Sequence, residues 1–590
     1  MIKKKDIAEF FDLEAEASKK SWEALMSLPV KDRIRKRRAI QSIYLNRDYR
    51  ETSDDGYVLI KVSVGVNLAD FKEGECLVLH KENSLSGIQC TLNSFVGDDE
   101  IILEVFPPNM PSNIDSYYDV PLLLDRDKVD LREHVFRPFI AQLSGLDNEF
   151  WESLLFNSKP TPTFEDKEKC EEELDNMIEN YNHFFKEANI SFLTKQKEAI
   201  VKCMAAKDYY LIQGPPGTGK SFVLSWIIFE EIMYHHHKVI VIGPNHMAIN
   251  NALGQVAKTI PTYPNIIKVG QSYNAPLIKV KVEDEERDIE NITRINTSYL
   301  NNFKHEWVIG LTPHSLFTSR ARGLECDTLI IDEAGQMTIP LALMGMIKAK
   351  KVILAGDHKQ LPPIISSEEV RSEMKQSAFQ SLITDDNYTM LDVSFRMCES
   401  ICNFVSDLFY EGNVKPNKQG CGELIECSDP LFDFHTPIVI HHVDDDGEQT
   451  SDKEADFIAD TIAGFINKGL PARELAVLSP FRAQAANVRR RIRKHPNIAE
   501  DDCTQIAADT IDKMQGQERE VIIFSLVSGN LDYMTEMAEF LYNPNKMNVA
   551  FSRAKSKLII VGNIEQIKNI SSSEYSHLRK MVESEYVKFI

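Results

Sequence analysis

The 590-residue sequence contains no apolar run close to the roughly 20 residues that a membrane span needs. Its amino terminus is basic, but an acidic amphipathic segment follows where a secretory signal would carry an apolar stretch. We therefore expect a cytoplasmic chain with no membrane partner, while a nuclear location stays open.

The sequence also contains few cysteines and fewer basic than acidic residues. The ten cysteines are scattered, and the nearest pairs, Cys398 with Cys402 and Cys421 with Cys427, have no second pair at zinc-site spacing. A reduced chain is favoured over a disulfide scaffold. Lys and Arg number 67 against 89 Asp and Glu, a net charge of −22, which argues against a histone-like protein that binds polyanions through its mean charge. A locally basic channel remains compatible with this balance.

The overall composition is that of a globular protein, with 43% hydrophobic and 26% charged residues, so disordered and collagen-like classes are excluded. At roughly 100 to 200 residues per domain, the length predicts three to five domains.

The first third of the chain changes pattern twice. Apolar residues recur at helical spacing over 1–56, short β-rich runs occupy 57–129, and helical spacing returns over 130–189. This pattern predicts a small β-barrel or sandwich between two helical arms, a stalked module.

After residue 190, about ten short runs that are apolar on both faces alternate with helical stretches. Runs of this kind are typical of buried parallel strands in an α/β sheet. A loop-rich region separates two groups of about five, so we predict two α/β domains, 190–390 and 391–590.

The strongest motif is GPPGTGKS, Gly214 to Ser221, which follows the strand-like YYLIQ and precedes a helical stretch. In this context the backbone of the glycine-rich loop encloses phosphates, Lys220 neutralises the β and γ oxygens, and the Ser221 hydroxyl binds Mg²⁺. A turn with an incidental lysine is the alternative, and the agreement of motif and context disfavours it.

The run LIIDEAGQ supplies the carboxylates that nucleotide hydrolysis requires. Asp332 at the end of an apolar strand would face Mg²⁺, and Glu333 would polarise the attacking water. Alone, such a pair is usually a solvated strand end, but the phosphate loop upstream favours the catalytic interpretation.

Seven segments, in order, resemble superfamily 1 helicases, and within them the branch of the nonsense-mediated-decay helicase and the immunoglobulin mu-binding helicase. They are GPPGTGKS, DEAGQ, AGDHKQLPP, SFRM, SPFRAQ, DKMQGQERE and NVAFSRAK, and the resemblance covers about residues 190 to 565. It implies two RecA-like P-loop NTPase domains with a stalked small β-barrel at the N-terminal side.

The resemblance also implies roles for single residues in binding and hydrolysing ATP. Gln196 would read the adenine edge, Phe395 would stack on the base, and Gln336 and Gln360 would sense the γ-phosphate. The catalytic set would be Lys220, Asp332, Glu333, Gln336, Gln360, Arg396 and Arg553. The nucleotide-binding set would be Gln196, Gly214, Pro215, Pro216, Gly217, Thr218, Gly219, Lys220, Ser221, Phe395, Gly516 and Glu518, with Mg²⁺ held through ATP by Ser221 and Asp332.

For the nucleic acid, the resemblance implies contacts to the phosphate backbone at strand ends, from Pro244, Asn245, His246, Thr312, Pro480 and Thr510. Two positions depart from the family pattern. Asn245 and His246 stand where Ser-Asn is usual, and Ser552 replaces the commoner Thr. Since no accessory zinc or nuclease segment is visible, we expect a nearly bare motor.

Together these features predict an ATP-dependent helicase or translocase on single-stranded nucleic acid, a monomeric motor that the resemblance implies travels 5′ to 3′. The alternatives are an ATP-gated clamp or ribonucleoprotein remodelling subunit without productive unwinding, and a P-loop metabolite kinase. RNA and DNA both remain open as substrates.

Two basic segments have no assigned role. For Lys31 to Arg38 a solvated stalk face is favoured over phosphate binding or a nuclear address, and for Arg489 to Lys494 a surface helix and a channel wall are equally supported.

Overall fold

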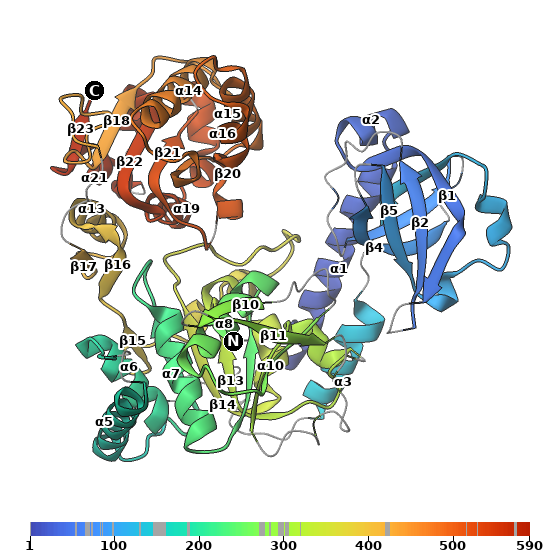
Figure 1. The fold of residues 1–590 in the computed structure, drawn as a ribbon, viewed down its shortest axis with the longest axis horizontal. Coiled ribbons are helices and arrows are strands. Elements are labelled where there is room, and N and C mark those ends of the chain that lie inside the picture. Colours follow the sequence, from blue (N-terminus) through green and yellow to red (C-terminus); the bar gives the residue numbers. More distant parts are fainter. Residues whose placement is uncertain are drawn as a thin grey trace.

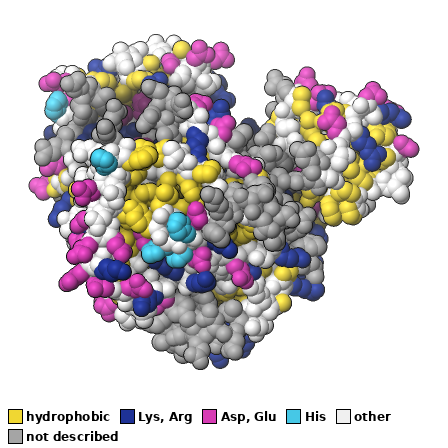
Figure 2. Space-filling model, turned by 60° about the horizontal axis from the view of Figure 1, so that its bottom comes forward, with side chains coloured by type: hydrophobic (Ala, Val, Ile, Leu, Met, Phe, Trp, Pro, Cys, Tyr) yellow, Lys and Arg dark blue, Asp and Glu magenta, His cyan; other side chains and the backbone are white. Residues whose placement is uncertain are grey.

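The computed structural model describes residues 2–590 apart from a series of segments: 53–55, 65–70, 72–74, 83, 85–86, 97–98, 129–130, 146–160, 186–188, 271–277, 283–284, 293–294, 296–299, 301–305, 319, 419–424, 515, 528 and 571–574. A small barrel and two α/β domains follow one another along the chain (Figure 1). In the space-filling view the barrel forms a lobe that a notch separates from the body (Figure 2). No helix within these described residues is both long and apolar enough to cross a membrane.

The barrel is closed by six antiparallel strands in the order β1-β2-β5-β4-β3-β6. Their bounds are β1 (Ala39–Thr52), β2 (Val58–Val64), β3 (Cys76–Lys81), β4 (Ile88–Val96), β5 (Glu100–Val105) and β6 (Leu122–Arg126). Apart from a bulge in β1, alternate side chains of each strand point inward and form one core, with Val62, Leu92 and Leu103 fully buried.

The prediction of helical structure over 1–56 is wrong for β1, so the barrel begins well before residue 57. The cause is a bulge: Ser42 has a φ of 58°, and pairing with β6 shifts register between Ile40 and Ile43. The extra residue places two inward-facing isoleucines three positions apart, and this is helical spacing. A period-2 strand therefore looked like a helix in the sequence.

Helix α1 (Lys4–Met26) connects the barrel to the first α/β domain, and α2 (Val30–Arg35) precedes β1 (Figure 1). Near its start α1 buries Phe10 and Phe11 in the core of that domain. Near its end, Trp22 Nε1 donates to Arg126 O at 2.9 Å at the base of the barrel. One long helix thus contacts both units.

The predicted second arm, 130–189, does not form one stalk in its described part. A π-helical turn (Arg132–Phe136) and α3 (Arg137–Ser144) pack beside α1, where the Phe139 ring meets that of Phe11 at 5.8 Å. In contrast, α5 (Lys167–Phe184) packs on the first α/β domain, with Leu174 and Met177 in its core. Residues 146–160 and 186–188 of this prediction lie outside the described residues.

The first α/β domain contains a nine-stranded sheet in the order β10-β11-β9-β12-β8-β13-β14-β7-β15. Neighbouring strands are parallel except in the β10–β11 pair. The bounds are β7 (Tyr209–Gln213), β8 (Lys238–Ile242), β9 (Ile266–Val269), β10 (Ile278–Val282), β11 (Glu285–Ile292), β12 (Trp307–Gly310), β13 (Cys326–Ile331), β14 (Ala349–Gly356) and β15 (Tyr388–Met390).

The second α/β domain contains a six-stranded parallel sheet in the order β20-β19-β21-β22-β18-β23. Its strands are β18 (Ile438–His442), β19 (Leu475–Ser479), β20 (Ala507–Thr510), β21 (Arg519–Ser525), β22 (Ala554–Gly562) and β23 (Val587–Phe589). A parallel pair, β16 (Val393–Cys398) and β17 (Lys415–Lys418), follows the first sheet in the chain.

Helices cover both faces of both sheets, so each strand is apolar on two sides. Tyr209 and Leu211 enter one core while Tyr210 and Ile212 enter the core on the other face, and the second sheet repeats this arrangement. The helices of the first domain are α6 (Thr194–Ala205), α7 (Lys220–Met233), α8 (His246–Thr259), α10 (Ile339–Met346), α11 (Ser372–Lys375) and α12 (Ala378–Leu382). The second domain has α13 (Glu399–Phe409), α14 (Asp452–Asn467), α15 (Arg482–Lys494), α16 (Glu500–Gln505), α17 (Leu531–Glu536), α18 (Ala538–Leu541), α19 (Pro544–Phe551), α20 (Ile564–Ile570) and α21 (Ser576–Glu583).

The predicted fold class is confirmed: two RecA-like α/β domains with parallel sheets and a closed β-barrel on the N-terminal side. All ten apolar runs read from the sequence are strands of the two sheets. The estimate of about five strands per domain was too low for the first sheet, where β9, β10, β11 and β15 add to the five strands expected from apolar runs.

Candidate nucleotide site between the two α/β domains

The phosphate loop connects β7 to α7 at the carboxyl end of the first sheet, and α7 begins at Lys220. Gly217 and Gly219 have φ values of +74° and +81°, which favour glycine. At Gly217 a Cβ would lie 2.5 Å from the Arg396 Cβ and 2.8 Å from Ser394 Oγ. The loop can therefore touch the segment that enters the second domain only because this residue lacks a side chain.

Lys220 is held between the two predicted catalytic carboxylates. Its Nζ lies 3.0 Å from Asp332 Oδ1 and 2.7 Å from Glu333 Oε1. Burial alone would lower the pKa of Lys220, but the two carboxylates raise it above its ordinary value. The acid pair and the phosphate-loop lysine thus form one charge cluster.

The pKa values of the two carboxylates shift in opposite directions. Burial raises the pKa of Asp332, and the nearby ammonium of Lys220 only partly opposes this. Burial also acts to raise the pKa of Glu333, but Lys220 and a hydrogen bond from Gln336 Nε2 at 2.9 Å outweigh it and lower the value. Glu333 is therefore the more acidic member of the pair.

Backbone geometry also singles out Glu333. Its φ of 57° lies in the left-handed region that non-glycine residues seldom occupy. Its N–H donates to Asp332 Oδ1 at 2.9 Å, which fixes the turn after β13. Strand β14 lies between β13 and the phosphate-loop strand β7, so the acid pair comes from the next strand but one.

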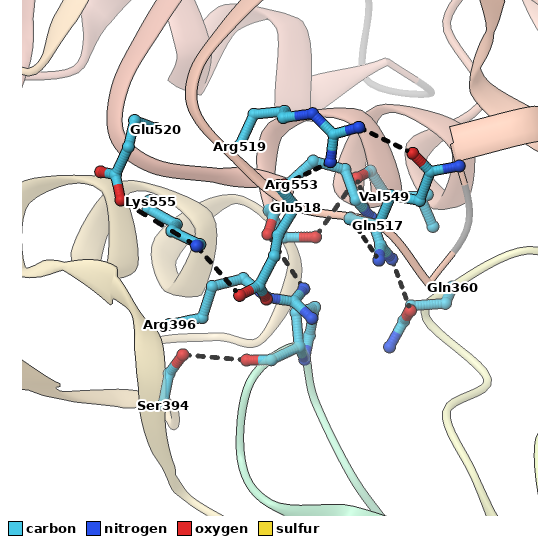
Figure 3. Close-up of polar contacts among 12 residues, drawn as sticks. Gln360, Ser394, Arg396, Gln517, Glu518, Arg519, Glu520, Val549, Arg553 and Lys555 are labelled. Carbon is cyan, nitrogen blue, oxygen red and sulfur yellow. Dashed lines mark hydrogen bonds and ion pairs between the residues drawn. The ribbon is translucent and has the colours of Figure 1, made fainter. Parts of the chain in front are cut away.

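Two arginines of the second domain face the phosphate loop across a cleft (Figure 3). Arg396, on β16, donates from Nε to Glu518 Oε2 at 2.6 Å and from Nη1 to Ser552 O at 3.2 Å. Arg553, directly before β22, donates from Nη2 to Gln360 Oε1 at 3.5 Å. Gln360, which follows β14, thus meets an arginine of the other domain.

Arg553 differs from Arg396 in its electrostatic surroundings. It is 3% exposed, and among the described residues no carboxylate lies within ion-pair distance of it. Burial, and then the charge of Arg396, lower the pKa of Arg553 to about 9. A buried guanidinium that only neutral groups contact favours an anion nearby.

A cavity of about 320 Å³ connects these groups. It is lined by the phosphate loop from Gly214 to Phe222, by Asn251, Gln255, Glu333 and Gln360 of the first domain, and by Arg396, Gly516 and Arg553 of the second. Most of the nucleotide-binding and catalytic residues expected from the sequence therefore meet in one place. Asn251 and Gln255, four residues apart on α8, had no motif to mark them.

The residues assigned to the base lie beside the loop. Gln196 is 5% exposed, and its Nε2 donates to Thr218 O at 3.1 Å. Phe395 donates from its backbone N to Gly217 O at 2.8 Å, and its ring is 45% exposed. The glutamine supports the loop in this state, while the exposed phenylalanine ring can accept a stacked partner.

A set of interdomain contacts was missed by the sequence analysis. The Tyr410 hydroxyl, after α13, donates to Asp357 Oδ2 at 2.5 Å and accepts from Asn548 Nδ2 at 2.7 Å. A tyrosine outside any motif could not have been found from the sequence.

Two asparagines of α19 bind the backbone of the loop that carries Gln360. Asn548 Nδ2 donates to Lys359 O at 2.7 Å, and Asn545 Nδ2 donates to His358 O and Gln360 O at 3.0 and 2.6 Å. Helix α19 therefore holds the backbone of the Gln360 loop.

The residues assigned to nucleic acid divide into two pairs of neighbouring strand ends. Pro244, Asn245 and His246 follow β8, Thr312 follows its partner β12, and Pro480 and Thr510 stand at the carboxyl ends of the paired strands β19 and β20. Asn245 accepts from Ala248 N at 3.0 Å and caps α8. Burial, with Lys268 and Arg320, lowers the pKa of His246 to about 4, so this side chain is neutral near pH 7 and is not a cationic phosphate ligand.

The two basic segments also differ from a uniform solvated face. Arg33, within the Lys31 to Arg38 run, is 3% exposed and pairs at 3.1 Å with the buried Asp125 of β6. In the second run Arg491 pairs with Asp452 and Asp456, both at 3.0 Å. These pairs favour a surface helix over a channel wall for the second run.

Comparison with known proteins places the two α/β domains in one family. A family model described as an AAA domain matches residues 191–306 and 301–368, and a second model of the same description matches 374–565. Together they cover well over half of the chain.

Similar proteins include the DNA polymerase alpha-associated DNA helicase A of Schizosaccharomyces pombe, 26% identical over 80% of this chain and 76% of that protein. An uncharacterized ATP-dependent helicase of Methanocaldococcus jannaschii is 26% identical over 66% of this chain and 72% of its own length. The DNA replication ATP-dependent helicase/nuclease dna2 of S. pombe is 26% identical over 66% of this chain, which spans 29% of that longer protein.

None of these three relatives is named for the nonsense-mediated-decay or immunoglobulin mu-binding branch, so that finer assignment stays a prediction. With both domain models matched in tandem and all three relatives named as helicases, the chain belongs to superfamily 1 of the ATP-dependent helicases.

Proposed function

We propose that the chain hydrolyses ATP in the cleft between its two α/β domains and uses the cycle to travel 5′ to 3′ along single-stranded nucleic acid and to unwind duplex ahead. One observation carries this proposal. Arg553 of the second domain is buried beside the phosphate-loop cavity of the first domain and has no carboxylate partner within the described residues. A γ-phosphate is the anion that fits this position.

The phosphate loop and its lysine bind the triphosphate in this mechanism. The loop cavity is lined by Gly214 to Ser221, and the amino end of α7 begins at Lys220. The Ser221 hydroxyl and the Asp332 carboxylate are the donors that would hold Mg²⁺, an ion that neutralises phosphate charge when bound. A carboxylate and a hydroxyl both offer oxygen ligands, which suit that hard ion.

Arrival of the γ-phosphate changes the surroundings of the base. Lys220 is paired with Glu333 at 2.7 Å, and this pairing lowers the pKa of the carboxylate. When the lysine turns toward phosphate, Glu333 loses its cation and becomes a stronger proton acceptor for water. The base is thus restrained until its substrate is present.

The remaining site residues connect the nucleotide with the second domain. Gln336 is hydrogen-bonded to Glu333, and Gln360 is hydrogen-bonded to Arg553. These two glutamines are the sensors of the γ-phosphate in this mechanism. Arg396 and Arg553 stabilise charge in the transition state, while Glu518 orients Arg396. Gln196 and Phe395 would hold the adenine, and Gly516 lines the same cavity.

Movement follows from the division of the site between two bodies. ATP draws the arginines toward the loop, and hydrolysis releases them, so the strand ends that carry Pro244, Asn245, His246 and Thr312 shift relative to those that carry Pro480 and Thr510. We propose that these loops grip the phosphate backbone of RNA or DNA and that one chain suffices as the motor.

Strand displacement from duplexes with a 5′ or a 3′ tail, measured beside ATPase with and without single-stranded DNA and RNA, tests the proposal. We expect ATPase stimulated by one of the strands and displacement from the 5′-tailed duplex. In Glu333→Gln, ATP should still bind while hydrolysis falls by about 10² or more, because the base is removed and the shape kept.

The alternatives predict other results. An ATP-gated clamp or remodelling subunit would show stimulated ATPase without displacement from either duplex. A P-loop metabolite kinase would show ATPase that nucleic acid does not change. Displacement from the 3′-tailed duplex alone would reverse the proposed polarity.

A further inference from the structure

A groove of about 920 Å³ lies between helix α1 and the base of the barrel, away from the nucleotide cavity. One wall is the helix, and the other is formed by the turn before β1 and the end of β6. The lining residues are Ala17, Ser18, Ser21, Trp22, Ala24, Leu25, Leu28, Lys36, Arg38, Arg126, Asp127, Lys128 and Ser366.

The groove carries positive charge in a strongly acidic chain. Four of its lining side chains are cationic, and Asp127 is the one acid among them. The Asp127 carboxylate already accepts from Gln89 Nε2 and from the Lys128 backbone, both at 2.8 Å. Within the described part of the chain, the side chains of Lys36 and Arg38 make no ion pair, so their charge is available to an anion.

An aromatic ring lies among these cations. Trp22 is half-buried, and its Nε1 bond to Arg126 O fixes the ring against the base of the barrel. The Lys128 ammonium lies over the ring at 5.5 Å from its centroid. Cations around a fixed aromatic ring are typical of surfaces that bind single-stranded nucleic acid, where rings contact bases or sugars and cations hold phosphates.

The groove is connected to the γ-phosphate sensor loop. Ser366, which lines it, follows Gln360 by six residues, and its N–H donates to the Glu14 carboxylate of α1 at 3.0 Å. Ser367 N donates to the same carboxylate at 2.8 Å. A ligand in the groove thus contacts the segment that continues from the nucleotide site.

We propose that this groove binds the sugar-phosphate backbone of the nucleic-acid strand on which the motor acts, with Lys36, Arg38 and Lys128 as phosphate contacts. The proposal rests on the proposed function and extends it, since it assigns the barrel and its stalk a stretch of the strand beyond the two α/β domains. The basic run that includes Arg33 then has two roles: its buried arginine builds the barrel, and its last residues face the strand.

A matched pair of triple variants tests this assignment. Lys36→Gln with Arg38→Gln and Lys128→Gln removes the groove cations, and Lys31→Gln with Arg35→Gln and Lys81→Gln removes three cations of the same module that do not line it. Oligothymidylate and oligouridylate are titrated by fluorescence anisotropy over a series of salt concentrations, beside basal ATPase and circular dichroism. Neither variant touches the nucleotide site, so basal ATPase reports the folded core.

The groove variant should bind at least one oligonucleotide about 10-fold more weakly, with a plot of log affinity against log salt shallower by about 2, because each lost phosphate contact on a single strand removes roughly 0.7. The control variant should match the wild type. Equal affinities and slopes in the two variants would overturn the groove assignment and leave the motor intact. Wild-type protein without any strand binding would instead overturn the proposed function itself. A polyglutamate peptide is titrated in the same way. If the groove variant lost binding to this peptide but kept its oligonucleotide affinity, the groove would be assigned to acidic proteins and the proposal would be overturned.

Discussion

The two α/β domains have parallel sheets of the same kind but contribute different chemistry to one site. The first ends its strands in a glycine loop, a lysine and two carboxylates, and the second offers two arginines and the glutamate that binds one of them. Since the sheets are alike, the difference resides in the loops at their carboxyl ends. Under the proposed function, the carboxylates of the first domain would hold the metal and the arginines of the second would neutralise phosphate charge, so neither domain alone would complete the site.

The two domains also differ in the partners that they offer to a buried carboxylate. Asp332 of the first domain lies 3.0 Å from Lys220, whereas Glu454 on α14 of the second domain accepts only from Ser525 Oγ at 2.6 Å and from Val527 N at 3.1 Å, with no cation among its described partners. Burial raises the pKa of Glu454 to about 8. We propose a catalytic role for Asp332, whereas Glu454 connects α14 with Ser525 and Val527.

The largest expected effect comes from removing the cation of the first domain. Lys220→Ala should abolish ATP turnover, because the loop loses its phosphate ligand and the carboxylates of Asp332 and Glu333 lose their partner. Steady-state ATPase measures this. The control is Lys197→Ala, a half-buried lysine on α6 that also pairs with two carboxylates, at 2.8 and 2.9 Å, and whose loss should leave turnover intact. Wild-type-like ATPase in the Lys220 variant would remove the first domain from the chemistry.

The next effect separates the two arginines of the second domain. Arg553→Ala should lower kcat by about 10³ with little change in ATP affinity, because a buried guanidinium without a carboxylate partner is positioned for transition-state charge. Arg396→Ala should lower affinity as well as kcat, because it leaves Glu518 without its 2.6 Å partner near the phosphates. ATP titration and single-turnover hydrolysis distinguish these patterns. Loss of affinity equal to the loss of kcat in the Arg553 variant would contradict the assigned role.

A smaller effect tests how the domains are coupled. Tyr410→Phe should lower nucleic-acid-stimulated kcat by about 2- to 10-fold, which is the range of one lost hydrogen bond, because Asp357 and Asn548 lose the hydroxyl between them. Basal ATP affinity should not change. Tyr542→Phe is the control, since its hydroxyl is fully buried without a hydrogen-bond partner among the described residues. Equal behaviour of the two variants would show that the hydroxyl of Tyr410 is not part of the coupling.

The smallest effect concerns stability alone. Because the folded-state pKa of Glu454 is raised to about 8, the native state keeps a proton that the unfolded state has already released, so this residue destabilises the fold increasingly as pH rises from its ordinary pKa toward 8. Glu454→Gln should therefore raise the unfolding midpoint at about pH 8 and leave it nearly unchanged at about pH 5. Thermal unfolding at both values measures this, and a gain confined to the lower pH would contradict the assignment.

Much of the two α/β domains could be predicted because their signals are local. Ten strands were visible as apolar runs, and the phosphate loop was visible because glycines, lysine and serine must follow one another between a strand and a helix. Strand β1 was misread because its bulge at Ser42 imitates helical spacing. Strands β9, β10, β11 and β15 of the first sheet were missed. β9 and β15 are too short to show a pattern, and β10 and β11 carry many charged residues in place of an apolar run.

The sequence by itself determined the fold class, the acid pair and the lysine, since each depends on residues that are close in the chain. Only the tertiary structure decided that Lys220 lies between Asp332 and Glu333, and that Tyr410 connects Asp357 with Asn548. It also decided that Arg553 is buried beside Gln360 with no carboxylate among its described partners. These contacts join residues from separate loops and domains, and their energies depend on burial and on the partners within a few ångströms. No local pattern in the sequence encodes the distances between these residues. They depend on the order of the strands in the first sheet and on how the two domains pack on either side of the cleft.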